Sequence, residues 1–100
     1  MARVSQNEAT FTTGHGCTST DTLYNQSTTN VYIEGVRVLL NGSKIADPHT
    51  YNPPDCDESH DITYTGGSPT VFANGIKIGR VGDPVDQGSI TTGATTVFCA

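Results

Sequence analysis

Two of the three histidines in this chain, and one of its three cysteines, fall within a single stretch, PHTYNPPDCDESH, at positions 48–60. The histidines are His49 and His60, and Cys56 lies four residues before His60. The third histidine, His15, lies upstream in GHGC, where flanking glycines permit the close backbone approach that a crowded site needs. Three imidazoles and one thiolate form a tetrahedral zinc site, which is structural when protein atoms fill all four positions. The residue types therefore predict a metal centre of three histidines and a cysteine.

Other interpretations of these residues remain open at this point. Cys17, two residues after His15, competes with Cys56 as the fourth ligand, whereas Cys99 in the apolar segment VFCA is expected to be a buried hydrophobe. Three cysteines are an odd number for a disulfide framework, and a reducing compartment would keep them as thiols. His49 and His60 could also be ordinary loop residues that hydrogen-bond to a nearby carboxylate, that of Asp55, Asp57 or Asp61.

The acidic residues and serines near the histidines do not form a recognised catalytic pattern. The acidic stretch contains Asp55, Asp57, Glu58 and Asp61. Their spacing does not match a twelve-residue calcium loop, so a solvated acidic loop is favoured. Ser19 and Ser59 lie near histidines, but no nucleophile elbow surrounds either one. We expect no enzyme activity, and the alternative is a small metal-dependent hydrolase with an open coordination site.

The elements that must position these residues are predicted to be β-hairpins. Apolar residues recur at every second position in VYIEGVRVLL (31–40) and TVFANGIKIGRVGD (70–83). Glu-Gly at 34–35 and Asn-Gly at 74–75 separate paired short strands, and Asn-Gly is the strongest short signal for a two-residue turn. Thr, Ser, Gly and Asn dominate elsewhere and favour turns or strands over helix. The predicted fold class is all-β.

The two hairpins are copies of one another. Residues 31–38 align without a gap with residues 71–78, and a third copy begins at 97–100. The N-terminal residues 2–4 are expected to supply its return strand, which would place the two termini side by side. Polar segments rich in Gly, Thr and Pro separate the copies, at 5–30, 46–66 and 82–94. We expect these segments to be irregular, and all three histidines fall in them.

Length and charge set the class of protein. The chain has 100 residues, 34% of them hydrophobic, which predicts one small domain over residues 1–100. Its core is expected to be thin, so that a metal ion, disulfides or a partner would help to stabilise the fold. A net charge of -5 and five scattered cations argue against nucleic acid as a partner. No apolar run reaches the roughly 20 residues needed to span a bilayer, and the start lacks signal-peptide features. We therefore expect synthesis as a soluble cytoplasmic protein, with any export by another route.

Taken together, these blocks resemble the PAAR-repeat proteins, which form the sharpened tip of contractile injection machines such as type VI secretion systems and contractile phage tails. The resemblance covers nearly the whole chain, and its most specific part is GHGC combined with NGIKIGRVGDPV. The other matching blocks are TTGHGCTST, NVYIEGVRV, DPHT, SHD, GGSPTVFANGIKIGRVGDPV and GSITTGATTVF. The resemblance implies a small cone of β-hairpins in pseudo-threefold arrangement, docked by its base on a trimeric β-helix spike with one tip per trimer.

The resemblance also implies a zinc ion near the apex, held by three histidines and one cysteine. His15 in GHGC, His49 in DPHT and His60 in SHD match the histidine positions of the family.

The cysteine position of the family does not match. Where many members carry Cys-Gly after GDPV, this chain has Asp-Gln-Gly at 86–88, and Gln87 is a poor zinc ligand. Cys56 is the predicted replacement, because it lies between two matched histidines and a thiolate suits zinc better than an amide oxygen. Cys17, a water molecule or a different metal such as iron are the alternatives.

The function that these expectations describe is mechanical. A structural zinc would order the apex loops, because apparent zinc-binding energies of roughly 10 kcal/mol or more become folding energy. The chain would then be a bare tip, made in the bacterial cytoplasm, assembled in a phage baseplate or a secretion apparatus, and driven into the target cell envelope. Its brevity favours a phage virion. A module that caps a spike without metal is a further alternative.

The apolar residues of the repeated hairpins are expected to divide between a small core and the docking base. They are Val31, Ile33, Val36, Val38, Val71, Phe72, Ile76, Ile78, Val97 and Phe98.

Overall fold

Short alternating segments of β-branched and aromatic residues form twelve strands, and the chain contains no helix. This description rests on a computed structural model that covers residues 1–100. The strands are β1 (Ala2–Arg3), β2 (Ala9–Thr12), β3 (Thr20–Leu23), β4 (Tyr32–Ile33), β5 (Val36–Arg37), β6 (His49–Tyr51), β7 (Glu58–His60), β8 (Phe72–Ala73), β9 (Ile76–Lys77), β10 (Pro84–Val85), β11 (Gly88–Ser89) and β12 (Phe98–Cys99). They pair antiparallel into six two-stranded sheets. The all-β fold class predicted from the sequence is confirmed.

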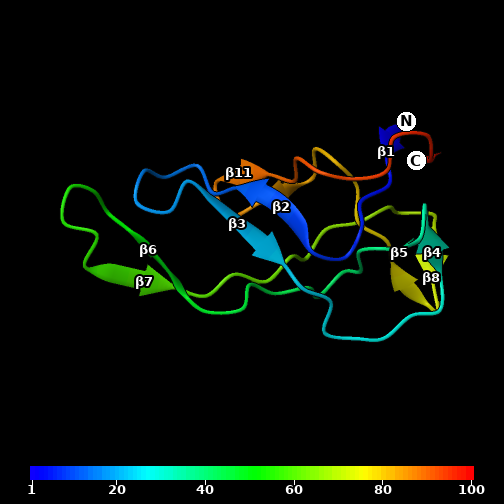
Figure 1. Ribbon diagram of the computed structural model, residues 1–100, viewed down its shortest axis with the longest axis horizontal. Helices are drawn as coiled ribbons and strands as arrows, with labels where there is room; N and C mark the ends of the chain where they lie inside the picture. Colours follow the sequence, from blue (N-terminus) through cyan, green and yellow to red (C-terminus); the bar gives the residue numbers. More distant parts are fainter.

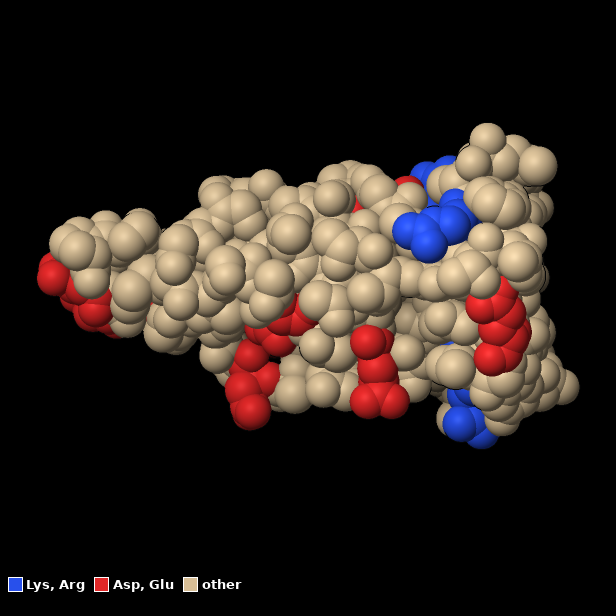
Figure 2. Space-filling view, turned by 45° about the horizontal axis from the view of Figure 1, so that its top comes forward, with Lys and Arg blue, Asp and Glu red and all other residues tan.

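The molecule tapers along its long axis. Its principal extents are 41 × 24 × 23 Å. Both termini lie at the broad end with β1, β4, β5 and β8, and the loop between β6 and β7 forms the narrow end (Figures 1 and 2). No helix is present that could cross a membrane. The outline therefore has a base and an apex, as the predicted cone requires.

Three equivalent hairpins form the broad end, which we call the base tier: β4 with β5, β8 with β9, and β12 with β1. The first two turn through Glu-Gly and Asn-Gly, whose residues all have positive φ, 52° and 83° at 34–35 and 52° and 82° at 74–75. The third hairpin forms between the chain ends, with Ala2 opposite Cys99. The predicted hairpins and the predicted adjacency of the termini are both confirmed.

A closed ring of backbone hydrogen bonds joins the three base hairpins. The ring uses the residue that lies two positions after β1, β5 and β9 in each copy. Ser5 N–H donates to Gly79 O at 2.9 Å, Gly79 N–H donates to Leu39 O at 2.7 Å, and Leu39 N–H donates to Ser5 O at 3.1 Å. Each copy thus donates to one neighbour and accepts from the other, so a single chain has threefold pseudosymmetry at its base.

The sequence suggested that the polar segments between the base hairpins are irregular, and this prediction is wrong. Each contains a further hairpin, β2 with β3, β6 with β7, and β10 with β11, and together they form what we call the apex tier. Thr is abundant in these strands, and Thr has a high β propensity because its branched side chain suits a pleated, half-buried surface. Buried Phe11 on β2 and Leu23 on β3 anchor the longest of these hairpins.

Two small hydrophobic clusters form the core, one in each tier. The apex-tier cluster consists of Ala9, Phe11, Leu23, Leu39, Ile45, Tyr64, Val85 and Ile90. The base-tier cluster consists of Val4, Val38, Leu40, Ala73, Ile78 and Cys99. Cys99 is buried, as predicted. Of the ten apolar hairpin residues, Val38 and Ile78 are buried in the core, whereas Val31, Val36, Val71, Phe72 and Phe98 remain exposed.

Candidate metal centre

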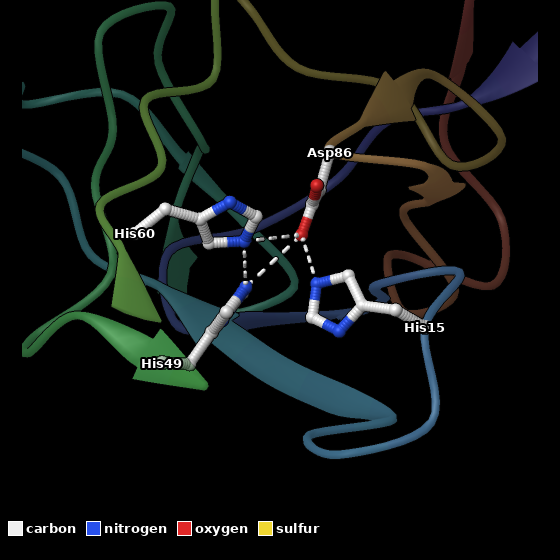
Figure 3. Close-up of side chains that lie close together, drawn as sticks. All are labelled: His15, His49, His60 and Asp86. Carbon is white, nitrogen blue, oxygen red and sulfur yellow. Dashed lines mark hydrogen bonds and ion pairs between the residues drawn. The ribbon is translucent and has the colours of Figure 1, made fainter. Parts of the chain in front are cut away.

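The three histidines and one carboxylate meet where the apex hairpins converge (Figure 3). His15 lies in the loop between β2 and β3, and Asp86 lies in the turn between β10 and β11. His49 begins β6 and His60 ends β7, and these two residues are directly paired across their hairpin. Each of the three apex hairpins therefore contributes at least one residue to the cluster.

Four side-chain atoms converge on a common point. His15 Nε2 lies 2.8 Å from Asp86 Oδ2, and His49 Nε2 lies 3.0 Å from the same oxygen. His60 Nε2 lies 2.8 Å from His49 Nε2 and 3.3 Å from Asp86 Oδ2. All four ligand atoms lie within 4.8 Å of one another. Ligands about 2 Å from an ion in a tetrahedron are roughly 3.3 Å apart, so the spacing suits one metal ion.

Two glycines allow the loops that carry His15 and Asp86 to approach this closely. Gly14 has φ of +78°, and a Cβ there would lie 2.2 Å from Gln87 O. A Cβ on Gly88 would lie 1.8 Å from Thr12 O. Any side chain at either position would push the β2–β3 loop away from the β10–β11 turn. Gly14 thus has the steric role that the sequence predicted, whereas a Cβ on Gly16 would make only an ordinary contact of 3.6 Å with Pro53.

A second layer of contacts orients the imidazoles. Asp21 on β3 places Oδ2 2.7 Å from His49 Nδ1, which leaves His49 Nε2 facing the centre. Tyr51 stacks on the His60 ring with centroids 4.5 Å apart. On His15, the buried Nδ1 has no hydrogen-bond partner.

The cluster is largely shielded from solvent. The side chains of His15, His49 and Asp86 are 9%, 4% and 6% exposed, whereas that of His60 is 31% exposed. Burial raises the pKa of the Asp86 carboxyl, but hydrogen bonds from His15 and His49 and the nearby charge of His60 outweigh burial and hold that pKa below its ordinary value. The Asp86 carboxyl therefore favours its ionised form, and imidazole nitrogens with a carboxylate oxygen are a donor set that can hold a metal ion.

The prediction that Cys56 is the fourth ligand is wrong. Cys56 forms a disulfide with Cys17, so neither sulfur belongs to the cluster. The physical reason is hairpin geometry: His49 and His60 pair at the root of β6 and β7, and Cys56 lies in the loop beyond the last strand pair. The expectation that these cysteines stay as thiols is also wrong, and Cys99 is the one free cysteine.

The residue that sequence reasoning missed is Asp86. It directly precedes Gln87, the residue matched to the family cysteine, and the turn between β10 and β11 directs Asp86 instead of Gln87 into the cluster. The sequence does contain one indication of this ligand, an aspartate in the two-residue segment between β10 and β11. The alternative in which the histidines bond to Asp55, Asp57 and Asp61 is also wrong, because their carboxylate partners are Asp21 and Asp86.

Comparison with known proteins identifies no family for this chain. No protein-family model matches this chain, and no curated protein matches it.

Proposed function

We propose that this chain is the tip of a contractile injection machine, a PAAR-like cone that caps a trimeric β-helical spike and pierces the target cell envelope. The observation that carries the proposal is the closed hydrogen-bond ring of Ser5, Leu39 and Gly79, which gives one polypeptide a threefold base. A single chain that presents similar contacts three times can match all three subunits of a threefold partner at once. The machine is a phage baseplate or a secretion apparatus.

The exposed apolar surface supports docking through the base. A depression at this end is lined entirely by hydrophobic residues and includes the equivalent Val31, Val71 and Val97 of the three hairpins. Phe72 and Phe98 line it too, and about half of each side chain is exposed, 51% and 49%. Exposed apolar patches of this kind on a small domain mark interaction sites.

The metal centre supports a stiffened apex at the opposite end. We propose that the metal is zinc, because three imidazoles and a carboxylate match its ligand preferences and its tetrahedral geometry. The ion would be held by His15, His49, His60 and Asp86, and it would supply binding energy that ties the three apex hairpins together. Four protein ligands fill a tetrahedral shell, which supports a structural role over the hydrolase alternative.

The experiment that tests the proposal is a stoichiometry measurement. The purified chain is mixed with the trimeric β-helical fragment of a contractile-machine spike, and the mass of the complex is measured by sedimentation or multi-angle light scattering. The expected complex has one chain per spike trimer. A Phe72→Asp variant, which places a charge in the apolar base, is expected to lose binding and keep its metal.

A matched control places the same change at an exposed aromatic residue outside the apolar base. Tyr24→Asp, which follows β3 and does not line the base depression, should leave spike binding unchanged. Three chains per trimer, or equal loss of binding in both variants, would contradict docking through the threefold base.

A further inference from the structure

The base tier carries three cations at equivalent positions. Each is the cross-strand partner of an exposed aromatic residue in its own hairpin: Arg37 opposite Tyr32, Lys77 opposite Phe72, and Arg3 opposite Phe98. The three aromatic side chains are equally exposed, at 52%, 51% and 49%. The pattern of aromatic residue and cation is therefore repeated by the same threefold pseudosymmetry as the hydrogen-bond ring.

The three cations have no carboxylate partner within the chain. The other two cations do: Arg80 Nε lies 3.0 Å from Asp83 Oδ1, and Lys44 Nζ lies 3.2 Å from Asp61 Oδ2. Arg3, Arg37 and Lys77 form no ion pair in a chain whose net charge is -5. Arg37 instead lies over the Tyr32 ring, 5.2 Å from its centroid.

The one side-chain carboxylate on a base-tier turn, that of Glu34, already has hydrogen-bond partners. Glu34 accepts hydrogen bonds from the backbone N–H groups of Thr95 and Thr96, each at 3.1 Å, and from the Thr96 hydroxyl at 2.8 Å. These hydrogen bonds, led by that of the Thr96 side chain, hold the pKa of Glu34 below its ordinary value. On the face shown in Figure 2, the Lys and Arg side chains gather toward the broad end, whereas acidic side chains are spread from the narrow end to the broad end.

We propose that the base recognises a threefold-symmetric protein end whose rim carries three carboxylates, one opposite each of Arg3, Arg37 and Lys77. The inference rests on the proposed function and adds the charge of the partner. Complementary rim charges steer encounter and fix the rotational register of two docked surfaces, while the apolar centre supplies affinity. The register matters here because only three orientations of a threefold end present equivalent contacts.

An anionic lipid surface is the other class of partner that aromatic residues and cations can bind. The threefold equivalence favours the protein partner, because a lipid surface gains nothing from cations at symmetric positions. The lipid surface is therefore an outcome of the test.

The test uses two engineered trimeric β-helical fragments that differ only at the rim of the docking end, which carries three Glu residues in one and three Lys residues in the other. Binding of the wild-type chain is measured by calorimetry at low and high salt. We expect the Glu-rim fragment to bind at least about tenfold more tightly in low salt, and the difference to shrink at about 1 M salt, where the Debye length falls to about 3 Å.

The variant that removes the pattern is Arg3→Gln, Arg37→Gln and Lys77→Gln combined, with its fold checked by circular dichroism and metal content. It should bind both fragments with similar affinity. The control is Lys44→Gln, which removes a cation outside the base and should keep the full preference for the Glu rim.

The outcomes separate the two proposals. Equal binding of both fragments by the wild-type chain overturns the acidic rim and leaves spike docking intact. Failure to bind either fragment overturns the proposed function and this inference with it. Binding to vesicles of anionic phospholipid, lost in the triple variant, with no preference between fragments, replaces the protein partner by a lipid surface.

Discussion

Two aspartates hold the metal-centre histidines from opposite sides. Asp86 faces the three Nε2 atoms and is the candidate fourth ligand, whereas Oδ2 of Asp21 lies 2.7 Å from the far nitrogen of His49. A carboxylate behind a ligating imidazole fixes the tautomer and ring orientation and raises the basicity of the ligand. Removal of a ligand should therefore weaken metal binding more than removal of the residue that orients it.

Metal analysis of single variants tests this distinction. The variants His15→Ala, His49→Ala, His60→Ala and Asp86→Ala should each lose most of the bound metal, because three ligands remain. Asp21→Asn should keep the metal but bind it about 10 to 100 times more weakly, as measured by competition with a chromophoric chelator. Asp61→Asn is the control and should match the wild type, because this carboxylate pairs with Lys44 and accepts the Ile62 N–H but is not part of the cluster. Full metal retention in all four ligand variants would contradict the proposed metal centre.

At the scale of elements, the disulfide and the metal are separate crosslinks. The disulfide joins the β2–β3 loop to the β6–β7 loop across 39 residues of sequence, while the proposed metal would join those hairpins to the β10–β11 turn. A crosslink that closes a loop of this length is worth about 4 kcal/mol in the chain-entropy model. Loss of either crosslink should leave the other in place.

We expect a Cys17→Ser and Cys56→Ser double variant to lose about 2–4 kcal/mol of unfolding free energy and to keep its metal. Denaturant unfolding with and without a chelator measures the two contributions. The matched control is Cys99→Ala, a substitution in the base tier, which should leave the stability sensitive to reductant. If the double variant loses its metal while folded, a cysteine belongs to the ligand set after all.

The hairpins of the base tier were predictable from the sequence, and those of the apex tier were not. Alternating apolar residues, with a Glu-Gly turn in one hairpin and an Asn-Gly turn in the other, identify the first two base hairpins locally. In β2, buried Ala9 and Phe11 alternate with threonines over only four residues, and Leu23 is the single apolar residue of β3. Their pairing depends on packing between tiers, which a local pattern does not reveal.

The same limit explains the candidate site. His15, His49 and His60 were found from residue type because histidine is rare in the chain. The fourth ligand depended on which turn residue points inward, and nearness of Cys56 to His60 in sequence gave the wrong answer because a hairpin separates its loop from its root.

At the scale of the whole molecule, the threefold base makes the position of the chain ends equivalent to a hairpin turn. In the first two base hairpins, two residues connect the last strand pair, at 34–35 and 74–75. In the third, Cys99 pairs with Ala2, so Ala100 and Met1 occupy the place of those two turn residues. A peptide bond from position 100 to position 1 would therefore complete a third two-residue turn.

A circular permutant tests this equivalence. The chain is joined from position 100 to position 1, with Ala100→Asn and Met1→Gly to supply the positive φ that the other two turns adopt, and it is opened between Asn74 and Gly75. One turn is closed and an equivalent one is opened, so the unfolding free energy should change by no more than about 1 kcal/mol, which corresponds to about 4–8 °C in Tm. The control permutant has the same junction and is opened between Leu39 and Leu40, beside a donor of the hydrogen-bond ring. It should melt well below the first permutant, because the ring is interrupted where the three copies meet; equal melting temperatures would show that the ring does not hold the base together.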